Sequence, residues 1–126
     1  MRKAGTMQIP DSDHPITIAP AAGPVRVHFA GRIVAESAQA LVLREADYPP
    51  VYYVPRGDVD MTLLARTGHE THCPFKGDAS YFSLDTGGRA SVNAAWSYER
   101  PFDSVSAIAG HLAFYPGRVD RIETPG

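Results

Sequence analysis

The feature that most constrains the fold is a series of short segments in which apolar and polar residues alternate. The segment Val25 to Phe29 alternates in this way, and Ala30-Gly31 separates it from the apolar run Ile33 to Ala35. A period of two is typical of a strand with one buried face. Glycine supplies the backbone freedom of a tight turn, so these two segments predict a β-hairpin.

Similar short segments recur along the chain between glycine and proline turns. Further strands are expected at 40–44, 51–54, 79–84, 89–98, 111–115 and 118–123, and short helices at 58–66 and 104–108. In the strand 89–98, strict alternation would place Val92, Ala94, Trp96 and Tyr98 on one face. Together these elements predict an all-β, mainly antiparallel fold: a small barrel or sandwich of about eight or nine short strands with one or two short helices.

The length of 126 residues fits one domain with one core. Residues 1–24 carry prolines at positions 10, 15, 20 and 24 and few bulky apolar groups, so no helix or continuous strand ladder is expected there. We therefore expect an extended N-terminal arm at residues 1–24, lying on the domain or fraying from it. Residues 25–126 are expected to form the single β domain.

Charge and composition argue against several kinds of partner. Twelve basic and fourteen acidic side chains give a net charge of -2, which supplies no positive field for a nucleic acid. No apolar stretch approaches the ~20 residues that cross a bilayer, and the first residues lack the apolar core of a signal peptide. The single cysteine, Cys73, cannot form an internal disulfide. We expect a cytoplasmic protein with neither a membrane nor a nucleic acid as partner.

The densest group of reactive side chains lies between Thr71 and Gly77. If the turn brings them together, a nearby cation could stabilise the Cys73 thiolate as a nucleophile. In this catalytic hypothesis Lys76 stabilises the thiolate or a substrate anion, and His72 moves protons. In the alternative interpretation Cys73 is an inert, small buried residue. The sequence leaves open whether the protein is an enzyme.

Motifs that bind metals or cofactors are weak or absent in the sequence. His69, His72 and Cys73 offer three donors within five positions, but no second Cys or His pair follows them. The chain also has no glycine-rich phosphate loop, no Gly-x-Ser-x-Gly segment and no His-Glu-x-x-His pair. We expect neither a metal site nor a cofactor.

Aromatic residues form a second candidate group. Tyrosine and tryptophan often line ligand pockets, because each offers a flat apolar surface and a hydrogen-bonding group. The residues concerned are Tyr48, Tyr52, Tyr53, Tyr81, Trp96, Tyr98 and Tyr115, interleaved with Arg56 and Lys76. We expect three or four of them to line a pocket, with Tyr53, Arg56, Tyr81, Trp96 and Tyr98 as the ligand-binding set. The alternative is that most of these rings fill the core.

Several longer motifs, taken together, resemble one known family. They are Tyr52-Tyr53-Val54-Pro55-Arg56-Gly57-Asp58-Val59, Thr71-His72-Cys73-Pro74-Phe75-Lys76-Gly77 with Ala79 and Tyr81, Ala95-Trp96-Ser97-Tyr98 before Pro101, Ile108-Ala109-Gly110, and Ala113-Phe114-Tyr115. The chain is similar, from about Val25 to its C-terminal end, to the domain of unknown function 427 family, which is sometimes labelled nucleotidyltransferase-like. The resemblance implies a small all-β domain, mostly bacterial, with no established biochemical role. Nucleotidyl transfer would ordinarily need a glycine-serine loop followed by paired metal-binding aspartates, and this combination is not present in the sequence.

Three functional hypotheses follow. The first is a pocket for a small polar molecule around Cys73, Lys76 and the aromatic residues. The alternative is a noncatalytic protein-interaction or homodimerisation module, because an exposed strand edge can pair with another chain. A weaker alternative is nucleotide binding through Arg56, Lys76 and the aspartates Asp58 and Asp60.

Overall fold

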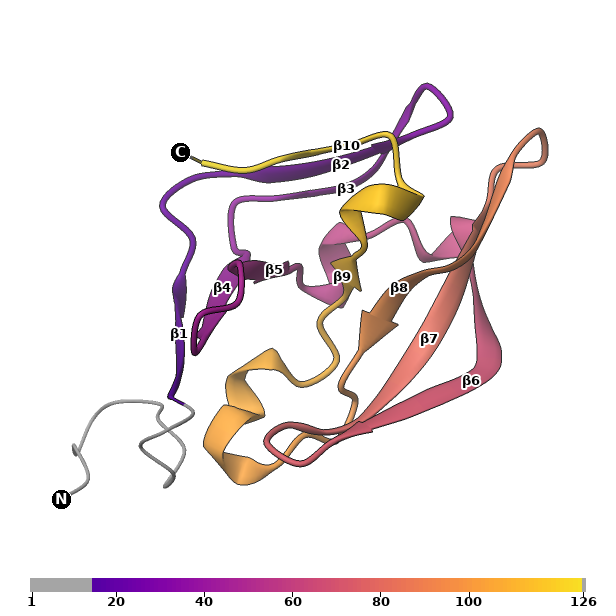
Figure 1. The fold of residues 1–126 in the computed structure, drawn as a ribbon. Coiled ribbons are helices and arrows are strands. Elements are labelled where there is room, and N and C mark those ends of the chain that lie inside the picture. Colours follow the sequence, from indigo (N-terminus) through magenta and orange to yellow (C-terminus); the bar gives the residue numbers. More distant parts are fainter. Residues whose placement is uncertain (1–14, 126) are drawn as a thin grey trace, which may run out of the picture.

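Residues 15–125, which the computed structural model describes, form ten strands and four short 3₁₀ helices (Figure 1). The elements are β1 (Ile16–Pro20), β2 (Val25–Phe29), β3 (Arg32–Ser37), β4 (Leu41–Glu45), β5 (Val51–Tyr53), η1 (Arg56–Asp58), η2 (Met61–Leu63), β6 (Leu64–Cys73), β7 (Gly77–Asp85), β8 (Ala90–Ser97), η3 (Asp103–Ile108), β9 (Ala113–Phe114), η4 (Pro116–Arg118) and β10 (Arg121–Glu123). The prediction of an all-β, antiparallel fold is confirmed. No helix within residues 15–125 is long and apolar enough to cross a membrane.

The strands form three antiparallel sheets, with orders β1-β4-β5, β10-β2-β3 and β6-β7-β8-β9. Figure 1 shows the three sheets arranged around a common interior. Val54, immediately after β5, and Leu112, immediately before β9, exchange backbone hydrogen bonds of 2.8 Å in both directions. This bridge joins the first sheet to the third and holds two walls of the interior together.

The core follows the period-two pattern that the sequence shows. Val25, Val27 and Phe29, on alternate positions of β2, are each 1% exposed and pack in one apolar cluster with residues of β7 and β8. A second cluster contains Leu43 and Tyr53, together with the tyrosines of β7 and of the segment after β8. The predicted hairpin is present, since β2 and β3 pair across the Ala30-Gly31 turn.

The N-terminal segment differs from the expected arm where the structure describes it. Residues Ile16–Pro20 form β1, a complete five-residue ladder with Leu41–Glu45, and Ile16 is fully buried. A proline is tolerated here because β1 lies at the edge of its sheet. The β domain therefore starts before residue 25, while residues 1–14 of the expected arm lie outside the described residues.

The helix expected at 58–66 is wrong. The chain instead makes two single 3₁₀ turns, η1 and η2, and then enters the ten-residue strand β6. Asp60 rather than Asp58 caps a turn, by accepting the backbone N–H of Thr62, while Asp58 accepts the hydroxyl of Ser37 at 2.6 Å. No apolar alternation marks β6 in the sequence, because most of its side chains are exposed on both faces. The second expected helix is present as η3.

The strict alternation expected for 89–98 is also wrong at one place. Asn93 has a φ of +51°, and the register between β7 and β8 shifts there. As a result Val92 is 71% exposed, whereas Ala94 and Ala95 are both buried. Such a bulge redirects the following side chains, and beyond it Trp96 lies directly opposite Tyr81 of β7.

Candidate functional site: an aromatic pocket

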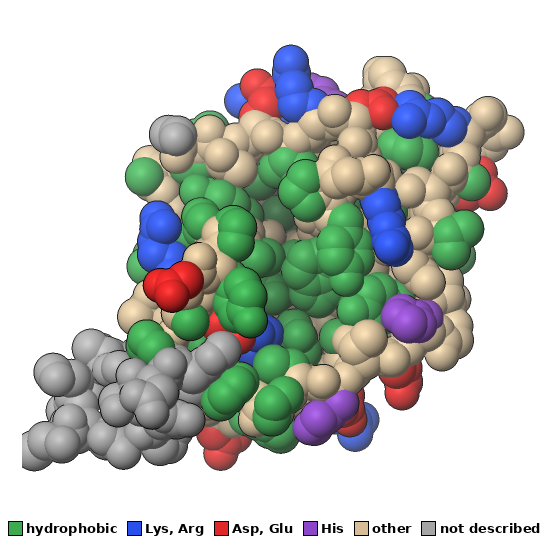
Figure 2. Space-filling view, in the orientation of Figure 1, with side chains coloured by type: hydrophobic (Ala, Val, Ile, Leu, Met, Phe, Trp, Pro, Cys, Tyr) green, Lys and Arg blue, Asp and Glu red, His purple; other side chains and the backbone are tan. Residues whose placement is uncertain are grey.

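A pocket of about 660 Å³ opens on one face of the domain, and all three sheets contribute to its wall. Every tyrosine of the chain and its single tryptophan line this pocket: Tyr48, Tyr52, Tyr53, Tyr81, Trp96, Tyr98 and Tyr115. Aliphatic side chains of β2, β4, β5 and β10 contribute to the rest of the lining. Figure 2 shows the same face hollowed, with hydrophobic side chains gathered in the hollow.

Contacts between the rings fix the aromatic part of the wall. Trp96 lies against Tyr115, with ring centroids 4.4 Å apart, and meets Tyr53 edge-on at 6.3 Å. Tyr115 is in turn stacked with Tyr81 at 6.4 Å. The indole N–H of Trp96 donates to the Tyr53 hydroxyl at 3.3 Å, and the hydroxyls of Tyr81 and Tyr115 are 3.3 Å apart. The rings therefore present a surface that is already ordered before any ligand arrives.

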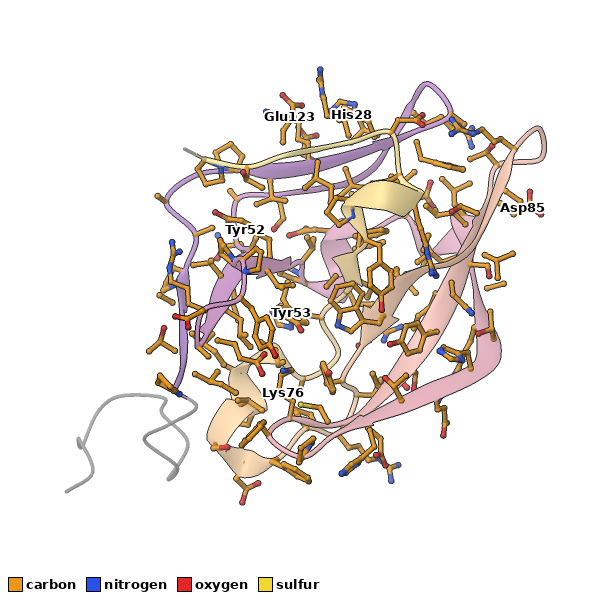
Figure 3. The ribbon with its side chains drawn as sticks, viewed as in Figure 1. His28, Tyr52, Tyr53, Lys76, Asp85 and Glu123 are labelled. Atoms are coloured by element: carbon orange, nitrogen blue, oxygen red, sulfur yellow. The ribbon has the colours of Figure 1, made fainter. Side chains whose placement is uncertain are left out.

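The pocket also contains a pair of opposite charges. Lys76 Nζ lies 2.5 Å from Glu45 Oε1, and the two side chains are only 9% and 15% exposed. The ammonium also lies 5.9 Å from the centre of the Tyr98 ring, in a cation–π arrangement. Figure 3 shows Lys76 below Tyr53, on the inner side of the strands. A donor and an acceptor are thus placed together within a largely apolar wall.

Local backbone geometry positions Lys76. The chain turns between β6 and β7, where the N–H of Lys76 donates to the carbonyl of Cys73 at 3.2 Å. The carbonyl of Lys76 accepts the N–H of Phe102 at 3.0 Å, which ties the turn to the segment before η3. Gly77 follows with a φ of +113°, a conformation that side-chain-bearing residues rarely adopt.

Burial extends the pH range over which the pocket phenols are neutral. It raises the pKa of Tyr53 and of Tyr98 well above the ordinary tyrosine value. Burial, as the larger cause, and the hydrogen bond with Tyr81 together raise the pKa of Tyr115 to about 12. These three hydroxyls therefore remain uncharged hydrogen-bonding groups into alkaline pH.

Comparison with known proteins places this fold in a family. The model of the family described as Domain of unknown function (DUF427) matches residues 17–124, which run from β1 to just beyond β10. The chain belongs to the DUF427 family. None of the curated proteins compared with the chain matches it.

Five of the eight residues selected from the sequence line the pocket of this DUF427 domain. They are Tyr53, Lys76, Tyr81, Trp96 and Tyr98. The expectation of three or four aromatic residues was too low, because the pocket gathers all seven. Glu45 was missed altogether: it is 31 positions from Lys76 in sequence, and no local pattern marks the end of β4 as part of a site.

Cys73 and His72 do not join Lys76 in the wall of the pocket. Successive residues of a strand point to opposite faces, and both residues are in β6. His72 is 63% exposed, with Nδ1 2.7 Å from Asp78 Oδ1. Cys73 is partly buried against the second core cluster, close enough to Tyr53 and Tyr98 to influence the pKa of both. The expected arrangement of Cys73, His72 and Lys76 is therefore not formed around the pocket.

Arg56 lies outside the pocket as well. Its Nη2 is 3.0 Å from Glu99 Oε2, its Nε donates to the carbonyl of Gly110 at 3.2 Å, and its guanidinium lies over the Phe82 ring. Arg66 pairs with the same Glu99 carboxylate at 3.3 Å. These contacts join η1 to the segments around η3, and they are sufficient to explain the position of Arg56.

The aspartates considered for nucleotide binding are also elsewhere. Asp58 and Asp60 line a second, shallower hollow that shares no lining residue with the aromatic pocket. Among residues 15–125, no three or more His, Cys, Asp or Glu side chains gather as a metal site. The DUF427 domain thus keeps Lys76 apart from Arg56 and from both aspartates.

Proposed function

We propose that this DUF427 domain binds a small molecule that carries a polar group on a flat, mainly apolar body. The observation that carries the proposal is the Lys76–Glu45 pair, which lines a pocket otherwise walled mainly by aromatic and aliphatic side chains. Ligand pockets commonly combine an apolar lining with a few convergent polar groups that orient the ligand.

The size and order of the pocket support binding. Its volume of about 660 Å³ lies within the ~300–1,000 Å³ typical of small-molecule sites. Because Trp96 is held by both Tyr53 and Tyr115, little side-chain entropy would be lost when a flat molecule stacks there.

The charged pair is hard to explain by stability alone. Replacing a buried ion pair by well-packed apolar residues is often neutral or stabilising, because both charges must lose their water. An ammonium with three N–H groups beside a carboxylate, in contrast, can recognise the polar group of a ligand. The proposed role is binding rather than catalysis, since neither Cys73 nor His72 lines the pocket.

The indole N–H of Trp96 provides a direct test, because Trp96 is the single tryptophan and gives the one indole N–H signal in an NMR spectrum of this chain. Benzamide and phenol are titrated as flat probes, and at least one should shift this signal in a saturable way. Val51 lines the pocket, so Val51→Phe should abolish the shift by filling the space. The matched Val92→Phe, at an exposed site outside the pocket, should leave the shift unchanged. If neither probe gives a saturable shift in the folded protein, the proposal is refuted.

Self-association is a second candidate, favoured by β6. This ten-residue strand forms one edge of its sheet, and an edge strand can pair with a second copy. The register shift between Arg66 and Glu70 interrupts that edge, which makes it a poorer template than a regular strand. Light scattering across a concentration series tests self-association. A mass that rises to that of a dimer supports pairing, and a constant monomer mass contradicts it.

Nucleotide binding has less support, because the pocket contains a single described cation, Lys76, already paired with Glu45. ATP, GTP and CTP should therefore leave the melting temperature unchanged. A stabilisation that grows with nucleotide concentration would instead favour this alternative.

A further inference from the structure

The balance of charge in the aromatic pocket narrows the class of ligand, an inference that rests on the proposed binding function. Lys76 and Glu45 are the charged side chains among the described residues of the lining, and their formal charges cancel. Arg118 is near, but its guanidinium lies over the Tyr115 ring and donates to the backbone carbonyls of Val92 and Asn93. It is not part of the lining.

We infer that the polar group of the ligand is uncharged and carries a hydrogen-bond donor beside an acceptor, as in a carboxamide or a lactam. A neutral group of this kind can accept from the Lys76 ammonium and donate to the Glu45 carboxylate without separating the pair. The ammonium has three N–H groups, of which one binds Glu45. A carboxylate can accept about four hydrogen bonds, so Glu45 can serve the ligand in addition to its present contacts.

Ionic ligands are disfavoured by the same pair. An anion drawn to Lys76 would lie next to the Glu45 carboxylate, and a cation drawn to Glu45 would lie next to the ammonium, because the two groups are only 2.5 Å apart. Repulsion between like charges is stronger at such a poorly hydrated site than in water. Separating Lys76 from Glu45 would relieve the repulsion. It would, however, leave one of the two charges buried without its partner, next to the charge of the ligand.

The aromatic wall is suited to the rest of such a molecule. Trp96 and Tyr115 offer ring faces, and the phenol hydroxyls of Tyr53, Tyr98 and Tyr115 are uncharged at neutral pH. A planar conjugated amide has a flat face for stacking and an edge that carries both a donor and an acceptor.

Benzamide, benzoate and benzylamine test the inference, because they share one ring and differ mainly in charge. Their affinities are compared at neutral pH by titration of the Trp96 indole signal. We expect benzamide to bind at least about tenfold more tightly than either ion, a difference of about 1.4 kcal/mol. If an ion binds as tightly as benzamide, and Val51→Phe abolishes its binding, the inference is overturned while the proposed function stands. If none of the three binds, the inference fails, and the proposed function stands only if phenol still gives a saturable shift that Val51→Phe abolishes.

Charge variants of Lys76 and Glu45 test whether the pair recognises the ligand or only stabilises the fold. Glu45→Gln leaves Lys76 as an uncompensated cation, so the preference should move from benzamide towards benzoate. Lys76→Met leaves the Glu45 carboxylate, so the preference should move towards benzylamine. Unchanged selectivity in both folded variants would contradict recognition by the pair. Should either variant fail to fold, the wild-type comparison decides the inference by itself.

Discussion

The ammonium of Lys76 and the carboxylate of Glu45, 2.5 Å apart, fasten the turn between β6 and β7 to the end of β4. Removing one partner should be strongly destabilising, because the other charge stays buried. For Lys76→Met we expect the free energy of unfolding to fall by about 2–5 kcal/mol. The double variant Lys76→Met/Glu45→Leu should recover most of this loss. Urea denaturation measures all three proteins.

An exposed ion pair serves as the control for this prediction. Arg26 and Glu36 pair across β2 and β3, and both side chains are more than a third exposed. Arg26→Met should therefore change stability much less than Lys76→Met does. If the two substitutions reduced the free energy of unfolding equally, the pocket pair would contribute no more to stability than a surface pair does, and the prediction would be wrong.

Gly77 should be needed for the position of Lys76. Its φ of +113° is costly for any other residue, although a Cβ atom would make only ordinary contacts of 3.5 Å with Arg100 and Pro101. We expect Gly77→Ala to cost about 1–3 kcal/mol through backbone strain alone. Gly57→Ala is the matched control, since Gly57 has no such φ and open space around it. Thermal melts that show equal stability for the two variants would contradict this account.

The parts of the fold that sequence reasoning predicted are those governed by local alternation. Val25, Val27 and Phe29 are buried because a regular strand turns every second side chain inward. Tyr81 and Trp96 meet because two strands joined by a short turn pair with one another. The aromatic pocket could be anticipated from such neighbours, at least in part.

The parts that escaped prediction depend on long-range packing or on local irregularity. The contact between Glu45 and Lys76 joins separate sheets, so neither segment announces it. β6 lacks apolar alternation because it is exposed on most positions. The bulge at Asn93 needs a positive φ that an asparagine tolerates but does not require. Nearness in sequence was also misleading for His72, which lies beside Cys73 in the chain but is solvent-exposed.

Acid should weaken the contact between β2 and the segment that leads into β10. The Asp120 carboxylate accepts the backbone N–H of Ala30 at 2.8 Å and pairs with Arg89, and these contacts hold its pKa below the ordinary value of 3.8. Because the folded state has the lower pKa, the stabilisation is present above pH 3.8 and is lost as pH falls through the folded value.

Asp120→Asn should therefore be less stable than the wild type at neutral pH, and the difference should shrink as the pH falls below 3.8. Thermal melts at a series of pH values measure this difference. A gap that stays constant over the whole series would show that the charge of Asp120 contributes nothing to stability.

Alkali should destabilise the protein through the pocket phenols. Burial and the hydrogen bond with Tyr81 raise the pKa of Tyr115 from 10.0 to about 12, and burial raises those of Tyr53 and Tyr98. A raised pKa in the folded state means that the neutral phenol favours folding. Its contribution is complete below pH 10.0 and is lost as pH rises towards about 12.

Stability measured by urea denaturation should fall steeply over this range, and less steeply in Tyr115→Phe, which has one fewer group to ionise. Tyrosinate absorbance should rise together with unfolding; if all the tyrosines ionised near pH 10 while the protein stayed folded, these rings would not be shielded from water in the way that the pocket requires.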